Sequence, residues 1–505
     1  MRPSNRPATT AAQPRLAIDV SPYRGEADFS AITDCFGPGA TLDPVSIADL
    51  LRNAFVYPPH SIYREVKLAG VSFEMPGDGL DEPRLRCDFP STWEPSPRAD
   101  VAVDEARLIQ TYHELLCRSV ARSTDGMRAP WLLQSGGKDS SSLAIALAEA
   151  RPDATCLTYL GGPEENEVAS ARAVARKLGL RHETLVCDPA RAYDRYLKMV
   201  PRMPLLSADF AALSYADLAW EVHARGGDGI LDGLGSDPYF GMPTHGRKRL
   251  AGLLARRWRV PRALFHAPLV RRSFRLCFAL ASLEMDRFER DFPGSRFSDA
   301  EVDELLGQPL AARSRARRDA YAGAIGTAPR EQTLHEISVT LIESACLAKG
   351  MYAAAAMSLR LGYPYCDEAL RAWVARELPA RLRVGPGGTN KVLVRKHIAR
   401  HFGELPYVSA KGSFRFDLCG LARQRFDRVH AFARECSDIV PGASTWLERH
   451  RGRLDNKYFA SKFYLLAVLL PWLLSRNRAV EHVPAGVQAG AGGVEAAPAR
   501  RERRG

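Results

Sequence analysis

Apolar and polar positions follow two different rhythms through the middle of the chain. Short apolar runs, typical of buried strands, alternate with segments whose apolar side chains recur every three or four residues, typical of helices. The strand-like runs cover 131–134, 154–160, 182–187 and the first part of 227–237, and the helix-like segments cover 141–150 and 167–179. This alternation predicts an α/β fold, with a parallel sheet flanked by helices on both faces.

The flanking parts of the chain show other patterns. Helical spacing also begins after Val101, and beyond residue 245 the pattern is mostly helical. The longest apolar run, Phe463–Leu474, contains Pro471 and predicts a buried helix. Between residues 40 and 90, short alternating runs predict strands, and residues 94–100 have the composition of a linker.

The two ends of the chain carry no such pattern. Residues 1–15 are rich in Pro, Thr, Ala and Arg, which predicts disorder, and residues 480–505 have the composition of a flexible tail. No apolar stretch of about 18 residues is uninterrupted, and the N-terminus lacks the apolar core of a secretory signal. We therefore expect a cytoplasmic protein without a membrane span.

Composition and charge add two constraints. Of the 505 residues 46% are apolar, and the ten cysteines form no Cys-x-x-Cys pair, so we expect a globular core and reduced thiols. The net charge is +12, and residues 238–283 hold ten Lys or Arg and no acidic residue. That segment is either a solvated helical surface or a docking site for an acidic or peptide partner, with RNA as a third candidate.

The most informative string follows the first strand-like run. Its members are Ser135, Gly136, Gly137, Lys138, Asp139, Ser140 and Ser141. The glycines let backbone N–H groups approach an anion at a helix N-terminus, and the serines add hydroxyl donors, which predicts a phosphate-binding loop. A carboxylate beside a phosphate requires a bridging cation, so Asp139 predicts Mg²⁺. The spacing differs from that of a Walker A loop.

This string resembles the pyrophosphate loop (PP-loop) of the N-type ATP pyrophosphatases, which cleave ATP between its α- and β-phosphates. Further motifs follow in the order found in the asparagine synthetase family, and the chain resembles that family over residues 105–475. The matching positions are Glu167, Ala171, Ala175, Leu178, Gly179, His182, Gly233, Gly235, Asp237, Phe240, Gly241, Pro364, Tyr365, Asp367, Lys391, Arg395, Leu405, Pro406, Lys411, Gly412 and Phe414. The resemblance implies an adenine nucleotide α-hydrolase-like domain over 101–479, with a mostly helical C-terminal part.

Departures from the family pattern narrow the implied function. The family's N-terminal half is a glutaminase with Cys at position 2, where this chain has Arg2. Residues 16–100 resemble only a truncated, β-rich and inactive remnant of that domain. Leu234 and Pro238 stand where asparagine-forming members carry acidic residues. Lactam-forming members, such as β-lactam synthetase and the lasso-peptide macrolactam cyclases, show similar losses.

The resemblance implies an AMP-forming amide ligase that uses ATP and Mg²⁺. A substrate carboxylate would attack the α-phosphate of ATP, and an amine would then displace AMP from the acyl-adenylate. Asp139 and Asp237 would hold Mg²⁺, with Gly235 in the turn that carries Asp237. Asp237 is also compatible with a plain turn.

The remaining site residues are assigned by the same resemblance. Lys411 would stabilise charge at the reacting centre, although a surface lysine is the plainer interpretation. The backbone around Leu133 and Leu160 would hold adenine, and Glu343 is a candidate general base for the amine.

Two further pairs have plain interpretations. Lys391 and Arg395 suit a solvated helix face better than substrate binding. His397 and His401 have the i, i+4 spacing of zinc ligands, but the sequence offers no third ligand, which argues against a metal site.

Several functions remain open. The first is closure of a lactam or macrolactam in natural-product biosynthesis, on a carboxylate-bearing substrate such as a precursor peptide delivered by a partner protein. The second is amidation of a small acid with ammonia or an amine. A tRNA-modifying pyrophosphatase is disfavoured, because the turn at Asp237 follows the synthetase pattern and no RNA-binding motif is present. A non-catalytic relic is the last alternative.

Overall fold

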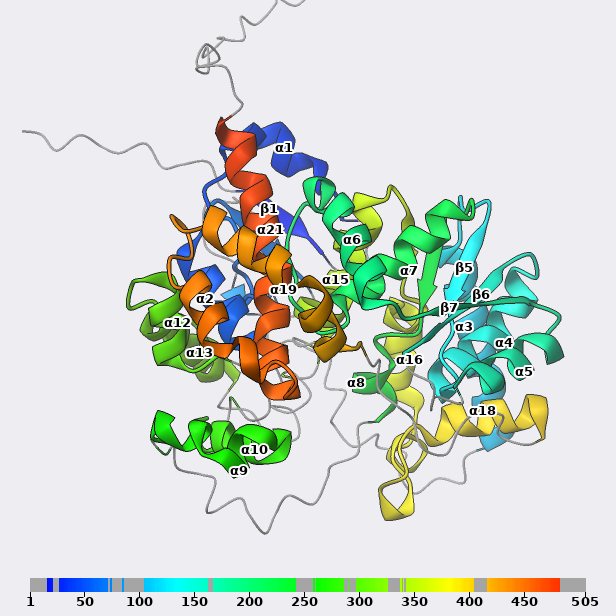
Figure 1. Ribbon diagram of the computed structural model, residues 1–505. Coiled ribbons are helices and arrows are strands. Elements are labelled where there is room, and N and C mark those ends of the chain that lie inside the picture. The colour runs from blue at the N-terminus through cyan, green and yellow to red at the C-terminus, as the bar shows by residue number, and fades with distance from the viewer. Residues whose placement is uncertain are drawn as a thin grey trace, which may run out of the picture.

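The computed structural model describes residues 16–20, 27–70, 73–74, 84–85, 104–161, 167–241, 258, 260–285, 289, 297–325, 337, 339, 342–403 and 416–481. The segments 1–15 and 94–100, and the 480–505 tail beyond residue 481, lie outside these residues, so their predicted disorder, linker and flexibility stay predictions. Figure 1 shows a lobe built on a sheet beside a lobe built of helices.

The predicted parallel sheet is present. Its strand order is β7-β6-β5-β8-β9, and every neighbouring pair is parallel. The strands are β5 (Pro130–Leu133), β6 (Thr155–Leu160), β7 (Arg181–Val186), β8 (Gly229–Asp232) and β9 (Arg360–Gly362). The first four match the predicted runs closely. The sequence analysis did not predict β9, a three-residue strand that lies within the mostly helical part and pairs with β8.

Helices cover both faces of this sheet. Those that share a core with one face are α3 (Glu105–Ser123), α4 (Lys138–Ala150), α5 (Glu167–Lys177), α16 (Glu368–Glu377) and α18 (Val392–Phe402). Those that share a core with the other face are α6 (Pro189–Met199), α7 (Ala212–Ala224) and α15 (Ala348–Ala356). Successive strand residues point to opposite faces. Leu132 and Leu231 therefore join the first core, and Trp131 and Ile230 join the second.

The second lobe is helical, as the pattern beyond residue 245 predicts. Its main helices are α12 (Asp299–Leu306), α13 (Ala311–Ile325), α19 (Leu418–Glu435), α20 (Ala443–His450) and α21 (Lys457–Glu481). Shorter helices elsewhere are α8 (Ser236–Phe240), α9 (Pro268–Arg272), α10 (Phe274–Leu283) and α17 (Ala380–Arg383). Single helical turns are η1 (Gly37–Gly39), η2 (Val200–Arg202), η4 (Arg262–His266), η5 (Ile342–Leu347), η6 (Pro364–Cys366), η7 (Pro386–Gly388) and η8 (Arg451–Arg453).

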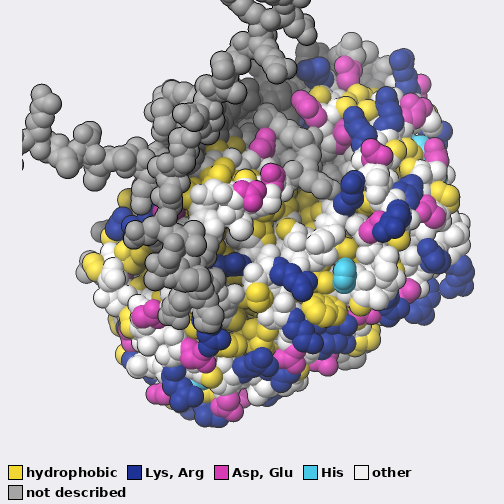
Figure 2. Space-filling model, turned by 90° about the horizontal axis from the view of Figure 1, so that it is seen from above, with side chains coloured by type: hydrophobic (Ala, Val, Ile, Leu, Met, Phe, Trp, Pro, Cys, Tyr) yellow, Lys and Arg dark blue, Asp and Glu magenta, His cyan; other side chains and the backbone are white. Residues whose placement is uncertain are grey.

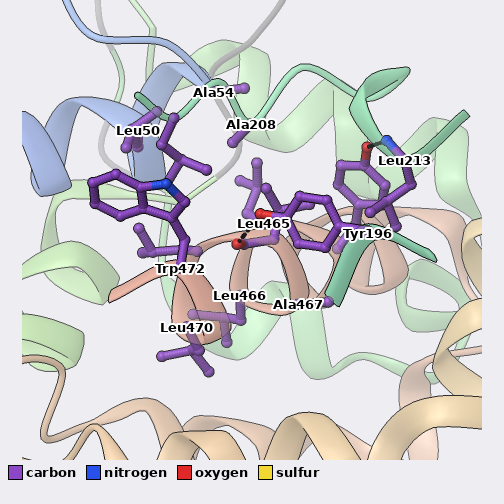
Figure 3. Packing of buried hydrophobic residues seen from close by; sticks show 14 of the residues in the cluster. Leu50, Ala54, Tyr196, Ala208, Leu213, Leu465, Leu466, Ala467, Leu470 and Trp472 are labelled. Carbon is purple, nitrogen blue, oxygen red and sulfur yellow. Dashed lines mark hydrogen bonds between the residues drawn. The ribbon is translucent and has the colours of Figure 1, made fainter. Parts of the chain in front are cut away.

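The apolar run at Phe463–Leu474 lies in α21, a buried helix as predicted. Its side chains pack against residues from distant parts of the chain, among them Leu50 and Ala208 (Figure 3). By length and composition Lys457–Arg478 could cross a membrane. However, 94% of the 18-residue window within it that passes this test is buried inside the protein. Burial of this kind is that of a core helix. The nine cysteines that the structure describes are free thiols, as expected.

The N-terminal segment combines helices and strands. It contains β1 (Leu16–Asp19), α1 (Ser30–Phe36), α2 (Pro44–Asn53), β2 (Val66–Ala69), β3 (Phe73–Glu74) and β4 (Arg84–Leu85). β1 pairs with β2 in parallel, and β3 pairs with β4 in antiparallel orientation. Nearly all of α2 is buried, and it serves as a core helix, so the described part of 16–100 combines this helix with short strands. The β-rich glutaminase-like remnant stays a prediction.

Buried ion pairs attach α2 to the helical lobe. Arg52 is 1% exposed and contacts Glu289 at 2.6 Å and Asp299 at 3.2 Å. Arg317 of α13 contacts Asp49 at 3.1 Å. Burial raises the pKa of Asp49 to about 6 even though the Arg317 guanidinium opposes this shift. Since a buried charge is tolerated only with a partner, these contacts fix α2 against α12 and α13.

Candidate active site at the centre of the sheet

The strand order creates a switch point between β5 and β8. From β5 the chain proceeds outward to β6 and β7, then returns to place β8 on the other side of β5. In open parallel sheets, ligands bind outside the carboxyl ends of the strands at such a point. The loop after β5 holds the Ser135–Ser140 string, and the turn after β8 holds Gly233 to Asp237. The topology brings both sequence motifs to one place.

The loop after β5 is held by its own serines. Ser140 Oγ donates to the Ser135 carbonyl at 2.6 Å and lies 3.1 Å from Ser135 Oγ. Ser141 Oγ lies 2.8 Å from the Gly137 carbonyl. Gly137 is the N-cap of α4, and having no side chain it cannot cap this end of the helix. This geometry is compatible with the phosphate-binding loop that the sequence predicted, and phosphate binding stays a prediction.

Glycine is required at two positions of the site. A Cβ on Gly136 would lie 2.8 Å from the backbone oxygen of Glu167, which opens α5. Gly235 has φ of +90° and packs against the Cys366 sulfur, so a side chain there would meet both strain and a clash. The two motif loops also touch directly, since a Cβ on Gly233 would lie 3.5 Å from the Ser140 nitrogen.

Lys391 joins the two candidate metal ligands. Its ammonium lies 2.8 Å from Asp139 Oδ2, 2.6 Å from Asp237 Oδ1 and 2.7 Å from Ser236 Oγ. The lysine is 1% exposed, so the predicted solvated helix face is wrong for this residue. Lys391 immediately precedes α18 with φ of +57°, and that backbone conformation directs it inward instead of along the helix surface.

The charge state of Lys391 follows from its two carboxylates. Burial alone would lower its pKa, but Asp139 and Asp237 outweigh burial and raise the pKa above the ordinary value. The site therefore holds an ammonium between two carboxylates at neutral pH. Two carboxylates that converge on one cation are also the hard oxygen ligands that Mg²⁺ prefers, so the donor set fits the predicted metal.

A chain of hydrogen-bonded hydroxyl groups contacts the backbone of the phosphate loop at Asp139. Tyr365 OH donates to the Asp139 carbonyl at 2.9 Å and lies 3.3 Å from Tyr112 OH, which lies 2.8 Å from Ser142 Oγ. Burial raises the pKa of Tyr365 well above its ordinary value, so this hydroxyl stays protonated and can donate. Asp367, matched to the family pattern, caps α16 instead, where it accepts from the Leu370 N–H at 2.9 Å.

The positions predicted for adenine lie at neighbouring strand ends. Leu133 ends β5 and Leu160 ends β6, and the two strands pair in parallel. Gln134 follows Leu133 and is 1% exposed. Neither the nitrogen nor the oxygen of its side-chain amide has a hydrogen-bond partner among the described residues. Because a buried amide without partners costs free energy, a polar ligand at this end of the sheet would fit. The adenine assignment remains a prediction.

A second buried lysine lies near the same strand ends. Lys349 of α15 is 7% exposed and pairs with Asp209 at 3.2 Å. Burial would lower its pKa, but the carboxylates of Asp209 and Asp232 contribute to raising it, so Lys349 is also charged. Glu343, the candidate base, lies in the π-helical turn η5 next to α15. Its side chain, like the whole of Lys411, lies outside the described residues.

Sequence reasoning missed three residues that the structure places here. Lys391 was matched to the family but interpreted as lying on a solvated helix face. Its position directly before a helix with buried residues was the signal that could have indicated its burial. Lys349 was recognisable as the lone charge in an apolar stretch, since such a lysine must be paired when buried. Gln134 had no signal in the sequence beyond its place beside the phosphate loop.

A cavity of about 840 Å³ lies away from this site. It is lined by α1, the turn at 201–204 and residues near the end of α21, and none of the motif residues borders it.

Charge on the described surface is mixed. Figure 2 shows Lys and Arg side chains interspersed with Asp and Glu over the right and lower parts of one face. Within the basic segment 238–283, the exposed apolar side chains are the more unusual feature. Six of the seven large hydrophobic side chains exposed among the described residues belong to it: Trp258, Leu264, Leu269, Phe274, Leu276 and Phe278.

Comparison with known proteins agrees with the motif order. The asparagine synthase family matches residues 111–424, which is more than half of the chain and spans all five strands of the sheet. No curated protein is similar enough to count as a match. Members of this family are ATP-using ligases that form amides on a PP-loop, adenine nucleotide α-hydrolase fold. The chain therefore belongs to the asparagine synthase family.

Proposed function

We propose that the protein adenylates a substrate carboxylate with ATP, releases pyrophosphate, and forms an amide by closing a lactam or macrolactam. One observation supports the proposal above all others. The phosphate loop after β5 and the Asp237 turn after β8 meet on the buried ammonium of Lys391. The N-terminus of α4 beside this cluster suits a phosphate, and two carboxylates that share one ammonium suit a triphosphate that brings a divalent cation.

The proposed reaction has two steps. A carboxylate oxygen of the substrate attacks the α-phosphorus, and the bond from that phosphorus to the bridging oxygen of pyrophosphate breaks. The amine nitrogen then attacks the acyl carbon, loses a proton to a base, and AMP leaves. Lys391 neutralises charge on the phosphates, and Lys411 does so at the acyl carbon in this proposal. Glu343 is the proposed base.

A bound Mg²⁺ would supply Lewis-acid charge neutralisation at the phosphates, held by Asp139 and Asp237. Asp237 is 59% exposed and Asp139 is 14% exposed, so one ligand is open to an incoming nucleotide and the other is fixed. Lys391 contacts both carboxylates, which keeps them convergent when no nucleotide is present.

The lactam assignment rests on the departures from the family. Leu234 and Pro238 replace acidic residues of asparagine-forming members, and in this structure Leu234 packs against Leu347 and Tyr363, while Pro238 is buried in α8. Neither position offers the carboxylate that asparagine-forming members carry, which favours a substrate other than free aspartate. We propose a peptide or amino acid with a tethered amine as that substrate.

The exposed part of the basic segment is our proposed docking surface for the peptide or its delivering protein. Arg271, Arg272 and Arg275 lie among the exposed Leu269 and Phe274 on α9 and α10. Exposed apolar side chains between cations suit an acidic, amphipathic peptide. We propose no nucleic-acid partner.

The test is ATP–pyrophosphate exchange with the full chain and Mg²⁺. The substrate panel contains peptides with an internal Asp or Glu, β-amino acids, and small acids with ammonia. We expect one peptide or amino acid class to stimulate exchange, and Asp139→Asn to abolish it. Asp427→Asn is the matched control, because Asp427 is 87% exposed on another lobe.

Exchange that is stimulated only by small acids with ammonia would replace lactam closure by simple amidation. Silence over the whole panel, with ATP binding intact in a direct binding assay, would contradict carboxylate adenylation of these substrates. Retention of exchange in Asp139→Asn would contradict the assignment of the site.

A further inference from the structure

Three histidines from two helices meet beneath the phosphate loop. His113 belongs to α3, and His397 and His401 lie one turn apart on α18. A ligand nitrogen from each lies within 4.8 Å of the others. His397 is fully buried and His113 is 8% exposed, whereas His401 reaches the surface. The sequence lacked a third ligand for the His397 and His401 pair, and the fold supplies it in His113.

The ring positions fit a tetrahedral metal ion. The ring centroids are 5.2 Å apart for His113 and His397, 5.1 Å for His113 and His401, and 4.9 Å for His397 and His401. With Zn–N bonds of about 2.0–2.1 Å, tetrahedral angles separate imidazole centroids by about 5 Å. His113 Nδ1 and His397 Nε2 face each other at 3.0 Å, so two ligand atoms already converge.

The other ring nitrogens have the partners that metal-binding histidines use. His113 Nε2 lies 2.8 Å from the Glu149 carboxylate, and His397 Nδ1 lies 2.9 Å from Ser142 Oγ. A ligating histidine commonly donates its second N–H to a carboxylate or another oxygen, which fixes the tautomer and the ring orientation.

We propose that His113, His397 and His401 form a zinc-type site for a divalent transition metal, with water in the fourth position on the exposed side. Imidazole nitrogens in a tetrahedral set suit Zn²⁺ better than Mg²⁺ or Ca²⁺, which prefer oxygen ligands. The site is separate from the carboxylate pair at Lys391.

The proposed metal would hold together the helices that carry the reaction site. α4 contributes Asp139 in its first turn and Ser142, whose hydroxyl contacts His397. α18 begins directly after Lys391 and carries two of the ligands. A metal that joins α18 to α3, with Ser142 attached, fixes the ends of α4 and α18 that place Asp139 beside Lys391. The site is therefore positioned to have a structural role.

The test is metal content of the full chain, produced without a histidine tag. Elemental analysis after dialysis should find about one zinc per chain, and Co²⁺ should give the visible absorption bands of a tetrahedral site. His401→Ala is the variant of choice, because His401 is exposed and its loss disturbs little packing. His430→Ala is the control, since His430 lies in α19 and contacts Ser444 and Glu448 instead.

We expect His401→Ala to weaken zinc binding at least about 100-fold. Ser142→Ala, which removes the hydroxyl beside His397 Nδ1, should weaken it about 10- to 100-fold. Competition with a chromogenic chelator measures both, and circular dichroism confirms that each variant is folded. Less than stoichiometric zinc in the parent after zinc loading, or equal affinity in His401→Ala and His430→Ala, would overturn the proposal.

Discussion

At the scale of the residue, one ammonium group decides how the candidate active site is arranged. Lys391 is almost wholly buried, and burial of an isolated cation is prohibitively costly. The ion pairs with Asp139 and Asp237 offset the cost of burying the Lys391 ammonium. The ammonium in turn reduces the repulsion between these two carboxylates, so they can lie close together. A nucleotide that brings its own cation and phosphates would meet a site in which the charges are already in place.

This account predicts a specific result for Lys391→Met. The variant keeps an unbranched side chain one atom shorter than lysine, but leaves the two carboxylates without their shared cation. We expect the rate of ATP–pyrophosphate exchange to fall by about 10²–10³, the usual cost of removing one charge-stabilising group. Arg395→Met, one turn along α18, removes a cation that instead bonds to the Asn390 carbonyl, and it should retain nearly full exchange.

The two variants must be compared at equal folded fraction, which thermal unfolding establishes. An equal loss of exchange in both would contradict a special role for Lys391 and return it to the solvated helix face that the sequence suggested.

At the scale of the element, α21 contains a proline that its neighbours accommodate. Pro471 has no N–H, so it cannot donate to the Ala467 carbonyl four residues earlier. Tyr193 OH donates to that carbonyl at 3.0 Å, and Tyr196 OH donates to the next one, Val468, at 2.7 Å. Figure 3 shows Tyr196 lying beside this turn of α21. Two tyrosines of α6 thus satisfy the carbonyls at the break.

A double-mutant cycle tests this compensation. Tyr193→Phe should lower the free energy of unfolding by about 1–3 kcal/mol, because it leaves the buried Ala467 carbonyl unsatisfied. In a Pro471→Ala background the new N–H can serve that carbonyl, so the same change should cost less. Urea unfolding of the four proteins measures both costs. An identical cost in the two backgrounds would show that Tyr193 acts through packing alone.

The ion pair between α12 and α21 gives a prediction for pH. Glu301 accepts both contacts of the Lys462 ammonium at 2.7 Å and lies in the capping box of α12. Burial would raise the pKa of Glu301, but the Lys462 charge lowers it from 4.5 to about 2. Because the folded pKa is depressed, the pair contributes stability above pH 4.5 and loses it as pH falls toward 2.

A shift of this size corresponds to about 3 kcal/mol at neutral pH. Glu301→Gln should therefore be less stable than the parent at pH 7, and the difference should shrink as pH falls below 4.5. Urea unfolding at pH 7, 4.5 and 3 measures the difference. A gap that stays constant down to pH 3 would mean that the carboxylate charge contributes nothing.

At the scale of the whole molecule, the elements that follow from a local pattern of apolar residues were predictable from the sequence. The features that depend on long-range contacts were not. The strands at 131–134, 154–160 and 182–187 and the helix at 167–179 were predictable, because period-2 and period-3.6 patterns are local properties. The loops after β5 and β8 were predictable for the same reason, because each follows a strand. Their meeting depends on the strand order of the sheet, which places the switch point between them.

What the sequence did not reveal depends on partners far away in the chain. β9 has three residues and no pattern of its own, and it exists because β8 offers it an edge. His113 lies 284 positions from His397, so no spacing rule could join them. α2 lies where the sequence predicted strands, and its Arg52 can be buried because Glu289 and Asp299 pair with it. The role of each of these residues depends on a partner that is distant in the sequence, so no local pattern indicates it.

The central claim is that a substrate carboxylate becomes bonded to AMP at the junction of β5 and β8. The most direct measurement uses the carboxylate that stimulates exchange, labelled with ¹⁸O in its carboxyl group. After one turnover, mass spectrometry of the nucleotide should find one ¹⁸O atom in the phosphate of AMP, with unlabelled pyrophosphate. Recovery of ADP and phosphate, or of AMP that carries no label, would contradict the account.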